Sequence, residues 1–198
     1  MDTLNQIFSL SLFLASFRFA TPLILAALGG IFSERSGVVN IALEGMILIG
    51  AFAAVYGSAS TGSPWIGVLY SMIAGLAFAA ILALVCVTFK ANQIVVGTGI
   101  NIFASGITIF LLQVLFGVKG TSPMVGRLPA YRFFGVRFNP ITYIALILVP
   151  VVWFIFFKTH WGLRIRSIGE HPAAADTLGI SVNKWRFISV LISGILAG

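Results

Sequence analysis

The sequence predicts an all-α fold, a single polytopic transmembrane bundle over residues 1–198 with about six spans, the last of them incomplete. Of the 198 residues, 59% are hydrophobic and 9% are charged, and the mean hydropathy is +1.07. So few polar residues cannot cover a soluble globule of this size. The apolar residues come in blocks of about 20, the length of a membrane-crossing helix, whereas membrane barrels show alternating strands of about ten residues.

The charged residues indicate a membrane partner rather than nucleic acid. The net charge is +7, and the Lys and Arg residues lie between the apolar blocks, where topology and anionic headgroups explain them. Cys86 is the single cysteine and lies inside an apolar block, which excludes a disulfide framework. His160 and His171 lack ligand spacing, so we expect no metal site. Asp2 without a basic region indicates no cleaved signal peptide.

The first apolar block, residues 7–32, is interrupted by Arg18 and by Thr21-Pro22. It exceeds the roughly 20 residues that a span needs. We therefore expect a surface-lying first part, a bend at Pro22 and a membrane helix that ends near Ile31. Ser36 would then cap a second helix, from about Val38 to Tyr56.

The second helix carries Asn40 and Glu44, which lie four residues apart among aliphatic side chains and would share one helix face. A carboxylate near the middle of a bilayer is unfavourable by about 2.5 to 3.5 kcal/mol, so it is normally turned away from lipid. Two interpretations stay open: the pair borders a solute path, or Glu44 only hydrogen-bonds a neighbouring helix. Gly45 suggests a local break of the helix at this point.

Small residues recur in the third helix, from Trp65 to about Phe89, and polar residues recur in the fourth, from about Ile94 to Phe116. The small residues predict a seam for close packing of another helix; they are Gly67, Ser71, Gly75, Ala79 and Ala83. Because lipid offers polar groups no partner, the polar stripe faces either a cavity or other helices. Its members are Thr98, Asn101, Ser105 and Thr108.

A basic connection over residues 117–138 follows, either a solvated loop near headgroups or a dock for an acidic partner, and then a fifth helix from about Pro140 to Phe157. In the loop 159–186, Pro172 stands where a first helical residue belongs and Gly179 where an αL cap belongs. These residues predict a helix of about two turns that must be held by packing. The apolar end of the chain covers about half a span, so we expect a truncated sequence.

The basic residues predict the orientation. By parity, positions 35, 90, 158, 164, 166, 184 and 186 lie on one side of the membrane, and positions 119, 127, 132 and 137 lie on the other. The positive-inside rule therefore places the loop 159–186 in the cytoplasm.

Three stretches resemble the permease subunits of bacterial ABC importers for simple sugars, branched-chain amino acids and nucleosides. They are ATPLILAALGG (20–30), SERSGVVNIALEGM (33–46) and WGLRIRSIGEHPAAADTLGI (161–180). The run ERSGVVNI (34–41) is most similar to the nucleoside branch. The order and length of the matches make them more specific together than singly.

The resemblance implies a permease in the bacterial inner membrane that is paired with a second permease. Two cytoplasmic ATP-binding subunits and a periplasmic solute-binding lipoprotein would complete the importer. It implies that Asn40 and Glu44 border the translocation path, and that residues 162–179 couple to the ATPase. The coupling residues are Gly162, Arg164, Gly169, Glu170, Pro172, Ala174, Ala175, Leu178 and Gly179, although His171 stands where Asn is expected. The chain itself would bind no cofactor, and ATP-Mg would occupy the partner ATPase.

Other functions remain as alternatives. A permease for simple sugars or branched-chain amino acids fits the same motifs. An ion-coupled secondary transporter would also carry Glu44 in a membrane helix, but it needs no cytoplasmic helix in the loop 159–186. An intramembrane enzyme would need a catalytic cluster at depth. No phosphate-binding GxxxxGK[ST] sequence occurs, so we expect the chain not to be an enzyme.

Overall fold

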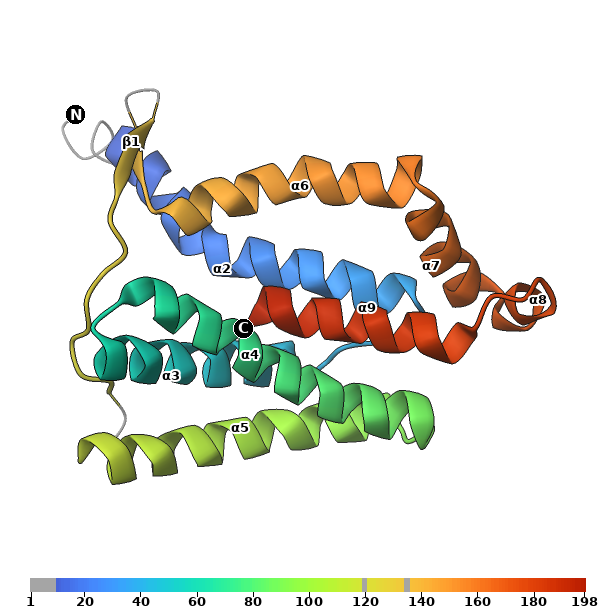
Figure 1. Ribbon diagram of the computed structural model, residues 1–198, viewed down its shortest axis with the longest axis horizontal. Coiled ribbons are helices and arrows are strands. Elements are labelled where there is room, and N and C mark those ends of the chain that lie inside the picture. The colour runs from blue at the N-terminus through green and yellow to red at the C-terminus, as the bar shows by residue number, and fades with distance from the viewer. Residues whose placement is uncertain (1–9, 119–120, 134–135) are drawn as a thin grey trace, which may run out of the picture.

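The computed structural model describes residues 10–118, 121–133 and 136–198, and it confirms an all-α polytopic bundle (Figure 1). Its helices are α2 (Leu10–Arg35), α3 (Leu43–Thr61), α4 (Pro64–Ala83) with the π-helical turn η1 (Leu84–Thr88), α5 (Gln93–Phe116), α6 (Pro140–Lys158), α7 (His160–Glu170), α8 (Pro172–Thr177) and α9 (Val182–Ala197). Among these residues, five helices are long and apolar enough to cross a membrane. The expectations for residues 1–9 and for Lys119 lie outside the described residues.

The helices pack side by side around α9. In Figure 1 the order across the bundle is α6, α2 and α9, then α4 with α3, and then α5, and the corresponding neighbours are in contact. The connections after α2, after η1 and around α8 lie at one end of the bundle, and the α3–α4 turn lies at the other. The parity predicted for these connections is therefore confirmed.

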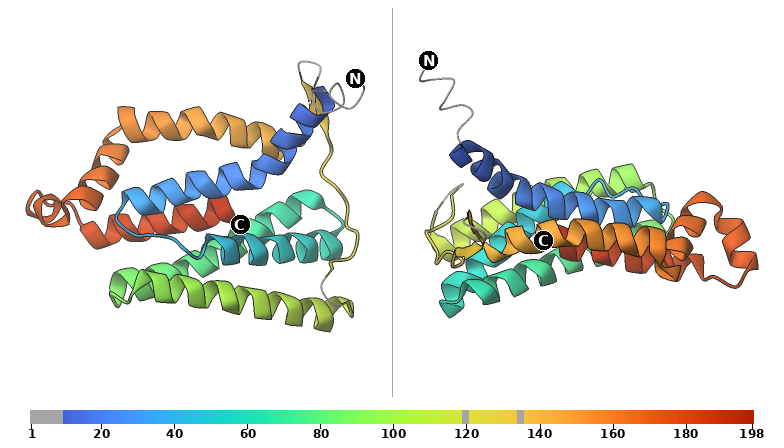
Figure 2. Two further views of the ribbon diagram at one scale, coloured as in Figure 1. Left: turned by 180° about the vertical axis from the view of Figure 1, so that it is seen from behind. Right: turned by 90° about the horizontal axis from the view of Figure 1, so that it is seen from above.

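The first helix differs from the prediction because Pro22 does not interrupt it. Helix α2 runs without a break from Leu10 to Arg35 with Pro22 inside it, and Figure 2 shows a change of direction in its N-terminal part. Proline removes one backbone donor and bends a helix, which a membrane helix can absorb by local adjustment. The predicted surface-lying segment before Pro22 is thus part of the same helix.

The predicted small-residue seam is confirmed in α4. A Cβ added at Gly75 would collide with the carbonyl oxygen of Gly194, and one added at Gly67 would lie 2.6 Å from the carbonyl oxygen of Ala54. The same face of α4 therefore admits the backbone of α9 at one end and that of α3 at the other. Close approach at glycine is what brings α9 to the centre of the bundle.

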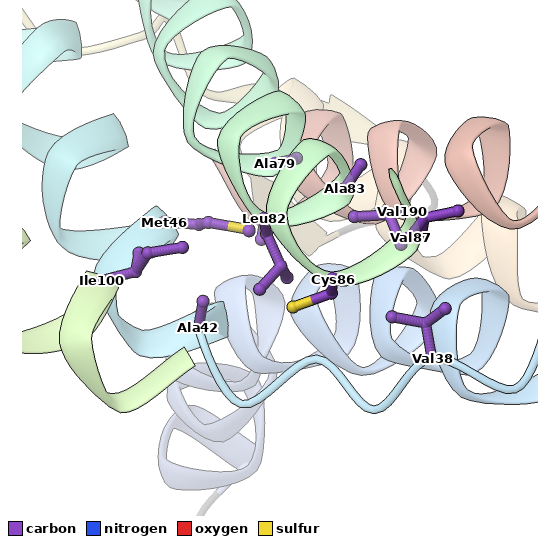
Figure 3. Packing of buried hydrophobic residues seen from close by; sticks show 11 residues of the cluster. Val38, Ala42, Met46, Ala79, Leu82, Ala83, Cys86, Val87, Ile100 and Val190 are labelled. Atoms are coloured by element: carbon purple, nitrogen blue, oxygen red, sulfur yellow. The ribbon is translucent and has the colours of Figure 1, made fainter. Parts of the chain in front are cut away.

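The main core cluster lies where α3, α4, α5 and α9 meet (Figure 3). Met46, Leu82 and Val190 are fully buried there, and Val38 and Ala42 join them from the chain between α2 and α3. This connection therefore contributes to the core through Val38 and Ala42, whereas Val39 and Ile41 are exposed.

The basic connection before α6 contains a short hairpin that the sequence did not predict. Strands β1 (Tyr131–Phe133) and β2 (Val136–Phe138) pair antiparallel, with Tyr131 opposite Phe138. The aromatic and β-branched residues of these two strands favour a pleated conformation. The hairpin lies at the end of the bundle away from α8 (Figure 1).

Candidate functional site

The candidate site is centred on residues 36–42, which we call the irregular segment because they form two turns joined by backbone without regular secondary structure, between α2 and α3. The predicted helix start at Val38 is wrong: α3 begins at Leu43. Asn40 and Glu44 consequently do not share a helix face. Gly37 takes a φ of 86°, a left-handed conformation that glycine tolerates without strain. The irregular segment enters the bundle, and α3 begins well inside the length of α4 and α5 (Figure 2).

The predicted break of the second helix at Gly45 is wrong. Helix α3 is continuous from Leu43 to Thr61 and passes through Gly45 without interruption. A Cβ at Gly45 would lie 2.8 Å from Asn101 Oδ1, so this glycine serves the close contact with α5. The irregular segment ends before α3 begins and connects it to α2.

The backbone of the irregular segment is not helical and so lacks helical hydrogen bonds, and side chains of α5 provide hydrogen bonds in their place. The Val39 N–H donates to Gln93 Oε1 at 2.8 Å. Asn101 Nδ2 donates to the Ile41 carbonyl oxygen at 2.9 Å, and Asn101 Oδ1 accepts from the Gly45 N–H at 2.8 Å. Backbone groups without a helical partner need such hydrogen bonds inside a membrane, where no water replaces them. Asn101 therefore joins the end of the irregular segment to the start of α3.

Asn40 is held from the opposite side, by α9. Its side chain is 4% exposed, and its Nδ2 donates to Ser193 Oγ at 2.9 Å. Its Oδ1 accepts from the Ala42 N–H at 3.1 Å, which stabilises the turn that leads into α3. Asn40 thus fixes the path of the backbone, and its amide is not open to a solute in this conformation.

Glu44 lies in the first turn of α3, and its side chain is exposed on this chain. The N-terminal end of a helix favours a negative charge. Among the described residues Glu44 forms no ion pair. The start of α3 lies away from both ends of the bundle (Figure 2), and exposure of a carboxylate to lipid would be unfavourable there.

The polar stripe of α5 is divided by the structure. Asn101 reaches the irregular segment, whereas Thr98 is exposed and donates to the Ile94 carbonyl oxygen at 2.8 Å within its own helix. Ser105 is exposed. Thr108 is 5% exposed, and its hydroxyl has no hydrogen-bond partner among the described residues. Only Asn101 is therefore brought to the irregular segment, and the other three do not form one lining with it.

The predicted short helix is confirmed as α8 at one end of the bundle (Figure 1). Gly179 has a φ of 79°, and the Ile180 N–H donates to the Ala175 carbonyl oxygen at 3.1 Å, as an αL termination requires. Leu178 is 80% exposed, whereas Ala175 is 2% exposed. We call residues 172–178 the knob: Leu178 is presented outward, and Ala175 holds the knob to the protein.

The preceding helix α7 was not predicted separately, and it gives two of the predicted coupling residues a packing role. A Cβ at Gly162 would collide with the backbone of Phe156, and one at Gly169 would collide with the carbonyl oxygen of Arg35. Arg164 is exposed and lies 5.6 Å from the ring centroid of Trp185. Glu170 is exposed just before the knob, and Pro172 and Ala174 are exposed within it.

Two cavities lie outside the predicted site. The larger, about 700 Å³, lies between α2, α3, α4, α6 and α9, and its polar lining includes Arg18, Ser71 and the hydrogen-bonded pair Thr21 and Thr142. The smaller, about 280 Å³, is apolar and lies between α6 and α9. None of the predicted path residues lines either cavity. No group of three or more His, Cys, Asp or Glu side chains suited to a metal occurs among the described residues.

Sequence reasoning missed the residues of α9 and α5 that hold the irregular segment: Ser193, Arg186 and Gln93. A signal was present for two of them. Arg186, Ser189 and Ser193 recur at spacings of three and four in an apolar segment, which places them on one helix face. Gln93 stands just before the predicted start of the fourth helix at Ile94, and no other polar residue at helical spacing pointed to it.

Within the described residues, the chain combines five helices apolar enough to cross a membrane, a helix that begins inside the bundle and an exposed knob at one end. Helices that begin or end inside a bundle are typical of membrane transport proteins. The family model described as "Branched-chain amino acid transport system / permease component" matches residues 12–198. The chain belongs to this permease family, which confirms the resemblance seen in the sequence. It is accordingly a multi-pass protein of the inner membrane.

Three relatives illustrate the similarity. The chain is 45% identical to the guanosine ABC transporter permease protein NupQ of Bacillus subtilis, over 93% of this chain and 63% of the relative. It is 36% identical to the nucleoside ABC transporter permease protein NupC of Lactococcus lactis, over 91% and 62%. It is 38% identical to the putative glucose ABC transporter permease protein TsgC13 of Haloferax volcanii, over 96% and 61%.

The chain spans slightly less than two thirds of the length of these curated relatives. No solved structure matches it.

Proposed function

We propose that this chain is the permease subunit of an ATP-driven importer and that it moves a nucleoside across the inner membrane. The observation that carries the proposal is the 45% identity, over 93% of the chain, to a permease named for guanosine. The second relative named for nucleosides supports the same solute class. Residues 1–198 form one permease domain, in which residues 159–186 are the coupling loop.

The exposed knob supports an external driving subunit. Leu178 directly follows the six-residue helix α8 and is 80% exposed. So short a helix that ends in an outward apolar side chain suits insertion into a socket of another protein. The partners are two cytoplasmic ATP-binding subunits, which hold ATP-Mg. A second permease and a periplasmic solute-binding lipoprotein complete the importer. The chain itself binds no cofactor and hydrolyses nothing.

The solute path runs beside the start of α3. Glu44 is exposed there at depth, and such a carboxylate is tolerated when it faces a watery path or a partner subunit rather than lipid. Asn40 and Asn101 shape this region by their hydrogen bonds. Thr98 and Ser105 are exposed on α5, and they extend the polar side of the path once the second permease is in place. Thr108 is buried on the same helix and reaches the path only if α5 moves during transport.

The mechanism is alternating access driven from the knob. Closure of the ATP-binding subunits pushes α8, and the bundle tilts so that the path beside Glu44 opens first to one side of the membrane and then to the other. The binding lipoprotein selects the solute, so the permease needs few specific contacts.

A sugar is the second candidate solute, because a relative named for glucose is 38% identical over 96% of the chain. Uptake of labelled guanosine, ribose and leucine by the assembled importer distinguishes the solute classes. We expect ATP-dependent uptake of guanosine that competing nucleosides suppress. Preferred uptake of ribose or leucine would replace the nucleoside assignment, and uptake that persists after ATP depletion would favour an ion-coupled secondary transporter.

A further inference from the structure

Arg186, in the second turn of α9, binds the backbone at the ends of two other helices. Its Nε donates to the Ser36 carbonyl oxygen at 3.1 Å, and its Nη2 donates to the Ile168 carbonyl oxygen at 3.5 Å. Ser36 directly follows α2, and Ile168 lies in the last turn of α7. Carbonyl groups at helix C-termini lack helical partners and carry partial negative charge, so a cation is favoured there.

Glycines make this three-way contact possible. A Cβ at Gly37 would lie 3.0 Å from Arg186 Nη2, and one at Gly169 would collide with the Arg35 carbonyl oxygen. The end of α7 therefore rests directly on the end of α2, and the guanidinium closes the junction. No larger side chain fits at Gly169 without separating the two helices.

Helix α9 also holds the irregular segment at a second point. Ser193 Oγ accepts from Asn40 Nδ2 at 2.9 Å, and Ser193 lies seven residues after Arg186, which is about two turns of the same helix. One rigid helix thus grips the irregular segment near its start and near its middle. The knob precedes this helix, separated from Val182 by only three residues.

We propose that Arg186 is a positioning residue that transmits movement of the knob to the irregular segment and so to the start of α3. The inference rests on the proposed function and adds to it the contact that carries force from the loop to the solute path. When the ATP-binding subunits push on α8, α7 and the start of α9 move with it. Residues 36–42 move in turn, because the Arg186 guanidinium is hydrogen-bonded to the Ser36 carbonyl oxygen. A lysine at this position offers a single point charge in place of the planar fork that now reaches two carbonyl oxygens.

The test compares Arg186→Gln and Arg186→Lys with Lys184→Gln in the full-length permease assembled with its ATP-binding and solute-binding subunits. Lys184 is exposed two residues away on the same helix, so its replacement removes the same charge without touching the junction. ATP hydrolysis stimulated by the loaded binding protein and uptake of labelled guanosine are measured on the same preparations. Their ratio gives the solute moved per ATP.

We expect Arg186→Gln to lower this ratio by at least about tenfold, as loss of hydrogen bonds from a charged group allows, while stimulated hydrolysis stays within about twofold. Arg186→Lys should recover part of the ratio, and Lys184→Gln should match wild type. A proportional fall of hydrolysis and uptake, or an unchanged ratio, would overturn the inference.

If Arg186→Gln does not assemble, Ser193→Ala takes its place and is judged by the same ratio. Absence of ATP-driven uptake in wild type would instead refute the proposed function.

Discussion

Asn101 and Asn40 show how an amide side chain replaces backbone hydrogen bonds inside a membrane bundle. Each offers a donor and an acceptor on one planar group, and both use them to hold the chain where it is not helical. Each was identified from the sequence as a polar residue at depth. Their partners were not, because the Asn40 contact spans 153 residues and the Asn101 contacts span 56 and 60.

Replacing Asn101 with Leu should destabilise the permease. The change leaves the Gly45 N–H and the Ile41 carbonyl oxygen without the partners they now have, and intramembrane hydrogen bonds contribute about 0.6 to 2 kcal/mol each. We expect the apparent melting temperature in detergent to fall by about 2–10 °C. Thr98→Val is the control, because its hydroxyl bonds only its own helix in the described structure. Equal melting temperatures for the two variants would contradict the role given to Asn101.

At the scale of elements, the sequence predicted those helices and turns whose conformation depends on neighbouring residues in the chain. The apolar blocks located the spans, Pro172 and Gly179 located α8, and Gly62 and Gly117 end α3 and α5 with φ values of 70° and 69°. The irregular segment was missed because its own residues fit a helix: Asn40 and Glu44 have helical spacing, and no proline intervenes. Its conformation is imposed by α5 and α9, so a single stretch of sequence cannot reveal it.

The contact between α4 and α9 gives a prediction about packing. Gly194→Val should prevent close approach, because an added Cβ would collide with Ala79 and lie 2.5 Å from the Gly75 carbonyl oxygen. We expect loss of about 1–3 kcal/mol or more from overpacking, measured as a lower yield of monodisperse protein and a lower melting temperature. Gly106→Ala is the matched control, since no atom lies within 4 Å of the added Cβ. If both variants behaved like wild type, the seam would not determine the packing.

The knob gives a prediction about coupling. Leu178→Asp places a charge on the outward side of α8 without disturbing Ala175, which is the buried residue of that helix. An apolar socket penalises a charge, so uptake should fall at least about tenfold while the permease still folds. Size-exclusion behaviour checks the fold, and stimulated ATP hydrolysis with uptake checks the coupling. Wild-type turnover in both assays would remove the knob from the mechanism.

At the scale of the whole molecule, the bundle has two distinct ends. One carries α8 and the connections after α2 and η1, and the other carries the α3–α4 turn and the β1–β2 hairpin (Figure 1). The irregular segment leads from the end of the bundle that carries α8 into its interior (Figure 2). In this layout α9 follows the knob in the chain, and it contacts the irregular segment that leads to the start of α3.

The orientation of the bundle is a separate prediction. In a Cys86→Ala background, Ala173→Cys at the knob and Ser60→Cys at the opposite end each provide one exposed thiol. Positive-inside topology predicts that an impermeant thiol reagent added outside spheroplasts labels Ser60→Cys at once and Ala173→Cys only after permeabilisation. Labelling in the opposite order would invert the topology and exclude contact between the knob and a cytoplasmic ATPase.

The environment of residue 44 decides whether solute passes beside the start of α3. Glu44→Cys in the Cys86→Ala background, assembled into the full importer, is exposed to a charged water-soluble thiol reagent and, separately, to a lipophilic one. We predict rapid reaction with the charged reagent and a slower reaction when the transported nucleoside is present. Reaction with the lipophilic reagent alone would place the side chain against acyl chains and contradict the proposed path.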